Sequence, residues 1–192
     1  MIKPQVVHRI RSTSLNHVQV LAGLFMACLA LAGCTRNHTT VDWPESFVPG
    51  EAALFSHNEV VIAAPCQRVW STLVAASTWP SWYGNAREVR LLDHDPTSLQ
   101  KNSTFTWITF GVAVRSEVRE YVPPTRLAWH GSTEGMTAYH AWLLQPLPTG
   151  CHVITEETNN GPSAIALRRT APEAIHDGHA TWLAQLKAIC EK

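Results

Sequence analysis

The stretch APEAIHDGHATWLAQLKAIC, residues 171–190, decides the fold because it is the one long amphipathic helix that the sequence offers. Pro172 and Glu173 suit its first turn, and Lys187 suits its last turn. Gly178 in its interior costs roughly 1 kcal/mol relative to Ala, which indicates close packing or a bend at that point. The apolar face of this helix consists of Ile175, His179, Trp182, Leu183, Leu186 and Ile189.

Upstream of this helix, apolar and polar residues alternate with a period of two, which is typical of antiparallel strands with one solvated face. In VAVRSEVREYV, residues 112–122, Val114, Ser116 and Val118 share one face and charged residues occupy the other. Strands are expected at 59–65, 87–93, 104–110, 112–122, 126–131, 137–147 and 151–158.

Two short helical segments follow the first strand. CQRVWSTLVAAST, residues 66–78, has its apolar residues at helical spacing, and WPSWYGNA, residues 79–86, is a second short helix or a turn. A sheet with one apolar face must be covered, and only the last helix is long enough to cover it. We therefore predict an α+β fold, with a curved antiparallel sheet of about seven strands around a long C-terminal helix.

This order of elements resembles the START-like superfamily, also called SRPBCC, and within it the polyketide cyclase/dehydrase and lipid-transport group. Three segments carry the resemblance and together span 59–192: VVIAAPCQRVWSTLVAASTWPSWYGNAREVRLL, RSEVREYVPPTRLAWHG and HATWLAQLKAICE. The resemblance implies a helix-grip fold with a cavity between the sheet and the last helix. It does not specify the function, because activities in this superfamily reside in the cavity and differ between members.

The resemblance also implies which side chains line that cavity. The candidate aromatic walls are Phe105, Trp107, Trp129, Trp142 and Trp182. The alternative is a filled core, because aromatic residues at strand spacing are usually packing residues.

Histidines and one acidic residue are the candidate polar groups of the cavity. His179 is either a core residue with its hydrogen bonds satisfied or a ligand-binding or acid/base group, and His140 shares a face with Trp142. Glu156 and Glu157 alternate on the last strand, so that one of them points inward; Glu156 is taken as the weak catalytic candidate. Whether His140 and His179 meet is left open.

No cofactor or metal site is predicted. His176 and His179 are three residues apart and could share a metal ion, but no third ligand lies near them in the sequence. The sequence contains no nucleophile elbow, no phosphate-binding glycine loop and no dinucleotide fingerprint. Cys66, Cys151 and Cys190 allow three different single disulfides, and their spacing does not choose among them.

The N-terminus resembles a bacterial lipoprotein signal. Lys3, Arg9 and Arg11 precede an apolar run, about 15 residues long, that ends at Leu-Ala-Gly-Cys34. We expect a signal peptide at 1–33, acylation of Cys34 and a tether at 34–58 whose last residues can dock on the domain. The alternatives to the lipoprotein signal are an uncleaved anchor helix and an ordinary signal peptide. Thr35 favours an outer-membrane location in the bacterial cell envelope, facing the periplasm.

The charge balance argues against a nucleic-acid partner. Cleavage after residue 33 removes Lys3, Arg9 and Arg11, which leaves 12 basic against 15 acidic residues. The favoured function is a lipid-anchored protein that binds a hydrophobic or amphipathic small molecule. The alternatives are a cyclase/dehydratase-type enzyme, which an envelope location disfavours, and a protein-interaction module with a vestigial cavity.

Overall fold

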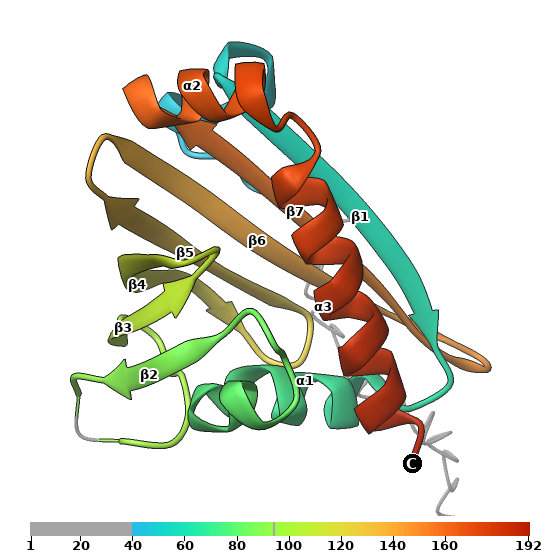
Figure 1. The fold of residues 1–192 in the computed structure, drawn as a ribbon. Coiled ribbons are helices and arrows are strands. Elements are labelled where there is room, and N and C mark those ends of the chain that lie inside the picture. The colour runs from blue at the N-terminus through green and yellow to red at the C-terminus, as the bar shows by residue number, and fades with distance from the viewer. Residues whose placement is uncertain (1–39, 94) are drawn as a thin grey trace, which may run out of the picture. The chain divides into compact units, whose positions relative to one another are not determined.

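In the computed structural model, the described residues, 40–93 and 95–192, form one antiparallel sheet of seven strands in the order β1-β7-β6-β5-β4-β3-β2 (Figure 1). The strands are β1 (Leu54–Ile62), β2 (Arg87–Leu91), β3 (Thr104–Thr109), β4 (Val112–Val122), β5 (Arg126–Thr133), β6 (Met136–Leu147) and β7 (Gly150–Asn160). The helices are α1 (Cys66–Val74), α2 (Pro162–Thr170) and α3 (Ala174–Cys190), with 3-10 helices η1 (Glu45–Phe47), η2 (Pro49–Glu51) and η3 (Ala76–Ser81).

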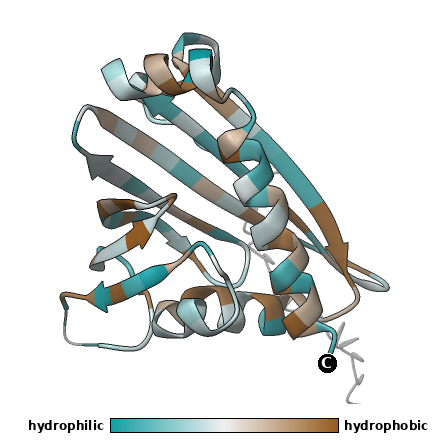
Figure 2. Cartoon of the chain, viewed as in Figure 1, coloured by the Kyte–Doolittle hydropathy of each residue, from teal (hydrophilic) through white to brown (hydrophobic). Residues whose placement is uncertain are grey.

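Helix α3 lies across one face of the curved sheet, which confirms the α+β helix-grip prediction (Figure 1). Its buried residues include Ile175, His179, Trp182 and Leu186, as its periodicity predicts. Hydropathy alternates along the long strands, because successive side chains point to opposite faces of the sheet (Figure 2). The two short helices after the first strand are also present, as α1 and η3.

An aromatic core fills the space between the sheet and helix α3 at the end near α1. Trp79 is fully buried at its centre, and its ring packs against Phe105, Trp129 and Trp182 at centroid distances of 5.2–5.8 Å. Its Nε1–H donates to the carbonyl of Leu73 at 2.9 Å, so that the one polar atom of the ring has a partner.

The folded domain begins earlier than the expected boundary at Glu59. Strand β1 starts at Leu54, and Val41, Trp43 and Phe47 pack on the outer face of the sheet against Tyr139 and its neighbours. Residues 41–58 are therefore part of the domain rather than of a free tether. Before Leu54 the sequence has no strand or helix period, because isolated apolar side chains attach this part of the chain to the sheet.

Three further findings concern the cysteines, the segment before α3 and the N-terminal region. Cys66 and Cys151 form a disulfide that joins the start of α1 to the start of β7, and Cys190 is a buried free thiol. The nine-residue helix α2 is an element that the sequence analysis did not predict. The predicted signal peptide, residues 1–33, and Cys34 lie outside the described residues. Among the described residues, no helix has the length and apolarity needed to cross a bilayer.

Candidate functional site

A cavity of about 440 Å³ lies between the sheet and the N-terminal half of α3. Strands β3 to β7 form one wall, and helices α2 and α3 form the other. The aromatic rings at its inner end are Trp107, Trp129 and Trp182. Of the predicted ligand-binding residues, Trp107, Trp129, His140, His179 and Trp182 line it.

Phe105 and Trp142 do not line the cavity, so their assignment as cavity walls is wrong. Both are fully buried in the aromatic core behind it, where Phe105 packs against Trp79 and Trp142 packs against Trp182. Both lie on the inward face of their strands, as predicted. Phe105 is two residues from Trp107 and Trp142 is two residues from His140, and at these positions side chains fill the space below the sheet. Strand parity predicts the face but not the depth at which a cavity ends.

Glu157, His140 and His179 meet at the inner end of the cavity. Glu157 Oε2 lies 3.0 Å from His140 Nδ1 and 3.3 Å from His179 Nε2, and the two imidazole rings stack with centroids 4.4 Å apart. All three residues are buried. The β6–β7 register places His140 directly opposite Glu157, while α3 brings His179 over both strands. We call these three residues the His–Glu–His cluster.

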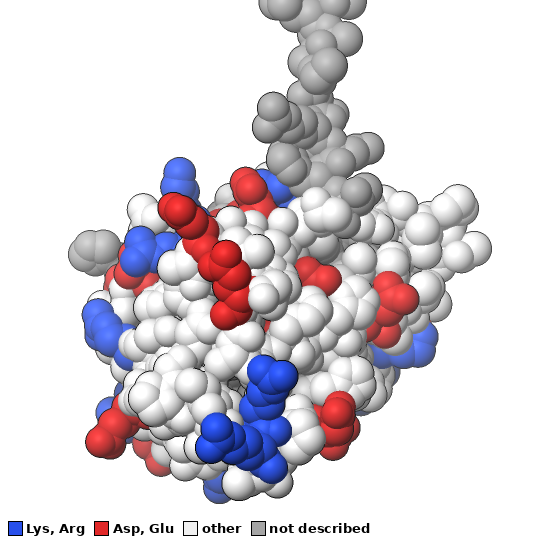
Figure 3. All heavy atoms as spheres, turned by 90° about the horizontal axis from the view of Figure 1, so that it is seen from above, with Lys and Arg blue, Asp and Glu red and all other residues white. Residues whose placement is uncertain are grey.

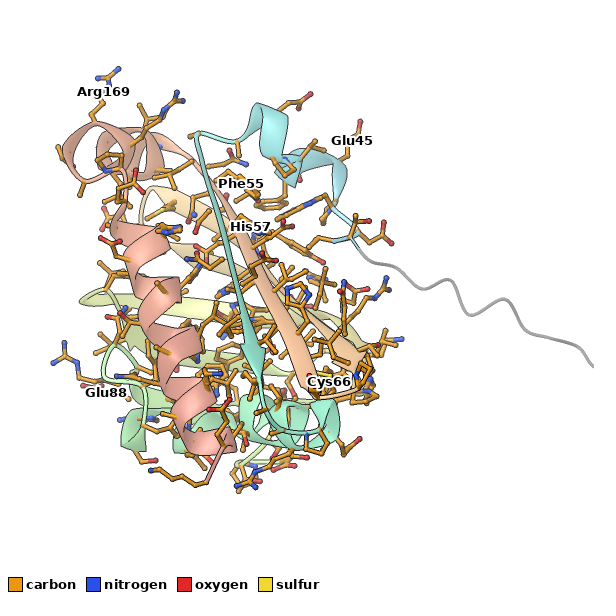
Figure 4. The ribbon with its side chains drawn as sticks, turned by 90° about the vertical axis from the view of Figure 1, so that its right-hand side faces the viewer. Glu45, Phe55, His57, Cys66, Glu88 and Arg169 are labelled. Atoms are coloured by element: carbon orange, nitrogen blue, oxygen red, sulfur yellow. A yellow bond between two sulfur atoms is a disulfide. The ribbon has the colours of Figure 1, made fainter. Side chains whose placement is uncertain are left out.

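Glu156 is not the inward carboxylate, which corrects the prediction. It faces the outside of the sheet, where its Oε1 lies 2.7 Å from Nδ1 of the half-exposed His57 on β1. Figure 4 labels Phe55 and His57 on the side of β1 away from α3. Glu157 therefore takes the inward position, with Thr155 and Val153 at the same parity and also buried.

Hydroxyl groups hold the far side of each imidazole. His140 Nε2 lies 2.7 Å from Thr155 Oγ1, and the Thr155 hydroxyl donates to the carbonyl of Ala141. His179 Nδ1 lies 3.3 Å from Ser56 Oγ, and the Ser56 hydroxyl donates to Asn58 Oδ1. These contacts orient both rings toward Glu157.

Burial and charge determine the protonation of this cluster. Burial, together with the neighbouring His179, lowers the pKa of His140 to about 4, although Glu157 opposes the shift. Burial alone would raise the pKa of Glu157, but attraction and hydrogen bonding to His140 and His179 hold that pKa below its ordinary value. At neutral pH, His140 is therefore neutral and Glu157 is a carboxylate.

Two hydrogen-bond donors beside the cluster lack a partner among the described residues. They are Asn159 Nδ2 and Trp182 Nε1, and both residues are buried and line the cavity. A buried donor without a partner costs about 1–3 kcal/mol. An oxygen atom of a bound molecule could accept from either donor.

Phe110 stands at the mouth of the cavity with 40% of its surface exposed. It occupies the β3–β4 turn with φ of 51°, a left-handed conformation that bulky residues rarely adopt. Its N–H donates to Asn85 Oδ1 at 2.9 Å, and its ring rests on Gly178 of α3. A Cβ at Gly178 would lie 2.3 Å from Phe110 Cζ, so the predicted close packing at Gly178 is confirmed.

Among the site residues, Glu157 was named as the alternative to Glu156, whereas Asn159, Ser56 and Phe110 were not predicted from the sequence. A signal for Glu157 was present, because Cys151 and Val153 share its parity and define the inward face of β7. Ser56 fell inside the expected tether. Asn159 and Phe110 lie at the ends of strands, where sequence alternation no longer shows which way a side chain points.

Comparison with known proteins identifies relatives of the domain. The family model described as "Polyketide cyclase / dehydrase and lipid transport" matches residues 56–191. No curated protein matches.

Solved structures with the same fold include proteins from several bacteria. The hypothetical protein jhp0584 from Helicobacter pylori is 34% identical, with a TM-score of 0.73 over 79% of this chain and 96% of that one. Protein CV1439 from Chromobacterium violaceum is 18% identical, with a TM-score of 0.56 over 72% of this chain and 97% of that one. The di-domain ARO/CYC StfQ from the steffimycin biosynthetic pathway is 15% identical, with a TM-score of 0.60 over 72% of this chain and 51% of that one. The last two show the fold alone.

Proposed function

We propose, from the premise that this chain belongs to the polyketide cyclase/dehydrase and lipid transport family, that it binds a hydrophobic or amphipathic small molecule between the sheet and α3. The observation that carries this proposal is an apolar cavity of about 440 Å³ with a small polar group at its inner end. Ligand sites are typically 300–1,000 Å³ in volume and combine apolar walls with a few placed polar groups. A vestigial cavity would be filled by side chains, so its volume argues against a pure interaction module.

The arrangement of the walls supports an orientation for the ligand. Asn159 and Trp182 supply donors without partners, so the inner end of the ligand carries an oxygen acceptor such as a carbonyl or hydroxyl. Val114 and Ile175 line the cavity with apolar surface, which suits a hydrocarbon or aromatic portion.

We further propose that the protein works in the bacterial envelope, anchored to the outer membrane through acylated Cys34. The Leu-Ala-Gly-Cys34 sequence supports the acylation, and two or more acyl chains give stable anchoring. The Cys66–Cys151 disulfide suits an oxidising compartment. Acidic and basic side chains are interspersed among many neutral ones on the face seen in Figure 3, so the surface there needs no strongly charged partner.

Native mass spectrometry of the full chain, delipidated and then mixed with extracted envelope lipids, tests the binding. The wild type is expected to retain one adduct per chain. Ala138 lines the cavity on β6, and Ala138→Phe should abolish the adduct by filling the cavity. Thr137→Phe, one residue along on the opposite face of β6, adds the same ring outside the cavity and should retain the adduct.

Equal retention by both variants would refute binding in this cavity. Absence of any adduct on correctly folded wild-type protein, against lipids and aromatic polyketones alike, would refute the function itself.

A second candidate function is acid/base catalysis of the cyclase/dehydratase kind. It is favoured by the contacts of Glu157 with His140 and His179 in a cavity that a carbonyl compound can enter. The test is hydrogen–deuterium exchange next to the carbonyl of an aromatic 1,3-diketone, followed by NMR. Wild type should accelerate the exchange and Glu157→Gln should not; equal rates for the two proteins would eliminate this candidate.

A further inference from the structure

The groups on the far side of the His–Glu–His cluster offer each ring an acceptor for its proton. The Thr155 hydroxyl donates its one proton to the carbonyl of Ala141, so its lone pairs can accept from His140 Nε2–H. The Ser56 hydroxyl donates to Asn58 Oδ1, so it can accept from His179 Nδ1–H. The Asn58 amide is held in this orientation because its Nδ2 donates to the carbonyl of His176 at 3.2 Å.

One nitrogen of each ring faces the same carboxylate oxygen, because His140 Nδ1 and His179 Nε2 both lie against Glu157 Oε2. Each of these nitrogens either donates its own proton to the carboxylate or, when the ring proton lies on the far side, presents a lone pair to it. With both ring protons on the far side, the two lone pairs and the carboxylate oxygen converge on one buried point. A divalent cation at that point would take the place of the two protons that otherwise join the rings to Glu157.

We propose that His140 Nδ1, His179 Nε2 and Glu157 Oε2 bind a divalent transition-metal ion such as Zn²⁺ or Fe²⁺. The three ligand atoms all lie within 4.8 Å of one another, and two of their separations are 3.0 and 3.3 Å. Metal–ligand bonds of about 2.0–2.2 Å at angles between octahedral and tetrahedral values place neighbouring ligand atoms roughly 3 Å apart. The separations of 3.0 and 3.3 Å match that spacing without a rearrangement of the backbone.

The identity of the ligands selects the class of metal. Two imidazoles and one carboxylate with further positions open are typical of catalytic zinc and of non-haem iron(II) sites, whereas Ca²⁺ and Mg²⁺ prefer oxygen ligands. Metal-binding histidines usually donate their other ring N–H to a neighbouring acceptor, which orients the ring. The Thr155 and Ser56 hydroxyls occupy that position beside His140 and His179. All three ligand residues line the cavity, so the open positions face the space in which a ligand oxygen would lie.

This site does not depend on the proposed function, and it makes a different use of the same side chains. A histidine nitrogen that binds the metal ion is not available as an acid or base.

Isothermal titration of the chelator-treated full chain with Zn²⁺, and absorption spectroscopy with Co²⁺, test the site. Wild type should bind one ion per chain, and Co²⁺ should give visible bands of nitrogen–oxygen coordination. Glu157→Gln, which keeps the size of the side chain, should weaken binding by more than 100-fold. Ser56→Ala and Thr155→Val keep all three ligands and should weaken binding by about 10–100-fold.

His57→Ala and Glu156→Gln are the matched controls, because His57 and Glu156 form a His–Glu contact of 2.7 Å between β1 and β7 on the outer face of the sheet. Both should bind the ion as the wild type does. Circular dichroism and thermal unfolding in chelator confirm that each variant is folded. Absence of saturable one-to-one binding to folded wild type would overturn the proposal, as would binding that survives Glu157→Gln and is lost in the outer-face controls.

A third variant separates this proposal from the binding function. Ala138→Phe fills the cavity but leaves the three ligands in place, so it should lose the lipid adduct and keep the metal ion. If wild type takes up lipid but no metal, only the metal site fails. If it takes up metal but no lipid, only the cavity function fails.

Discussion

Glu157 is a carboxylate in a position that exposes almost none of it to water, and the residues around it determine the cost of that burial. An isolated buried carboxylate costs several kcal/mol, whereas contacts with hydrogen-bonding groups offset part of this cost. His140 and His179 provide these contacts and are themselves oriented by Thr155 and Ser56. Folding alone does not require such a group here, so its presence points to a ligand.

Thr158, next to Glu157 but on the outer face, offers a residue-scale test of the same energetics. It is fully buried beside Phe55 and Tyr139, and its hydroxyl has no partner among the described residues. Thr158→Val keeps the shape and removes the unpaired donor, so it should raise the free energy of unfolding by about 1 kcal/mol. Urea denaturation measures this change, and a loss of stability would show that the hydroxyl has a partner.

At this scale the sequence predicted less of the site than of the fold. Five cavity residues could be predicted, because periodicity shows which face a residue occupies and the family resemblance implies that this face lines a cavity: Trp107, Trp129, His140, His179 and Trp182. The choice between Glu156 and Glu157 requires the register of β7 against β6. The exclusion of Trp142 from the cavity walls requires knowledge of how far the cavity extends into the core. The contact of His140 with His179 joins residues from a strand and a distant helix, and no local pattern encodes it.

At the scale of elements, the β3–β4 turn and helix α3 form the mouth of the cavity together. Phe110 adopts a left-handed backbone conformation and places its ring on Gly178, where a larger residue would collide with it. Gly178 therefore lowers the helix propensity of α3, but it leaves room for the Phe110 ring that closes the mouth of the cavity. A residue in an unfavourable conformation at the rim of a cavity is typical of a functional constraint.

A double-mutant cycle between Gly178 and Phe110 measures this contact. Gly178→Ala alone should change stability little, because the gain in helix propensity is offset when the Phe110 ring is displaced, and the ligand should dissociate faster. In a Phe110→Ala background the same change should add about 1 kcal/mol to the free energy of unfolding. If the two single-variant changes in unfolding free energy sum to the double-variant change within about 0.5 kcal/mol, the two residues do not interact.

Most of the elements themselves could be predicted from the sequence. The seven strands, α1, η3 and α3 follow from periodicity and from prolines at their ends. Helix α2 was not predicted, because only Ala164 of its nine residues is buried and it shows no clear apolar face. Docking of the end of the tether on the domain was expected, but its extent over residues 41–51 was not, since it depends on contacts of Trp43 and Phe47 with Tyr139 on β6.

At the scale of the whole molecule, the Cys66–Cys151 disulfide joins segments that are 85 residues apart in sequence. A cross-link over a loop of that length stabilises the folded state by about 4 kcal/mol in the chain-entropy description. The double variant Cys66→Ser/Cys151→Ser should lose about 2–5 kcal/mol of unfolding free energy, measured by urea denaturation.

Reducing agent serves as the internal control for this prediction. It should destabilise the wild type and leave the double variant unchanged, because Cys190 is a free thiol. Alkylation of the protein as isolated from cells, followed by mass spectrometry, should find Cys66 and Cys151 linked. Free thiols at both positions would argue against the proposed envelope location.

The central claim is that the space between the sheet and α3 receives a small molecule whose polar end meets the His–Glu–His cluster. An experimental electron-density map of the full chain, purified from its native membrane without delipidation, tests this most directly. The account predicts continuous density that follows the apolar walls and ends within hydrogen-bond distance of Asn159, Trp182 or the cluster. A map in which side chains close the cavity, with no density other than protein between the sheet and the helix, would contradict it.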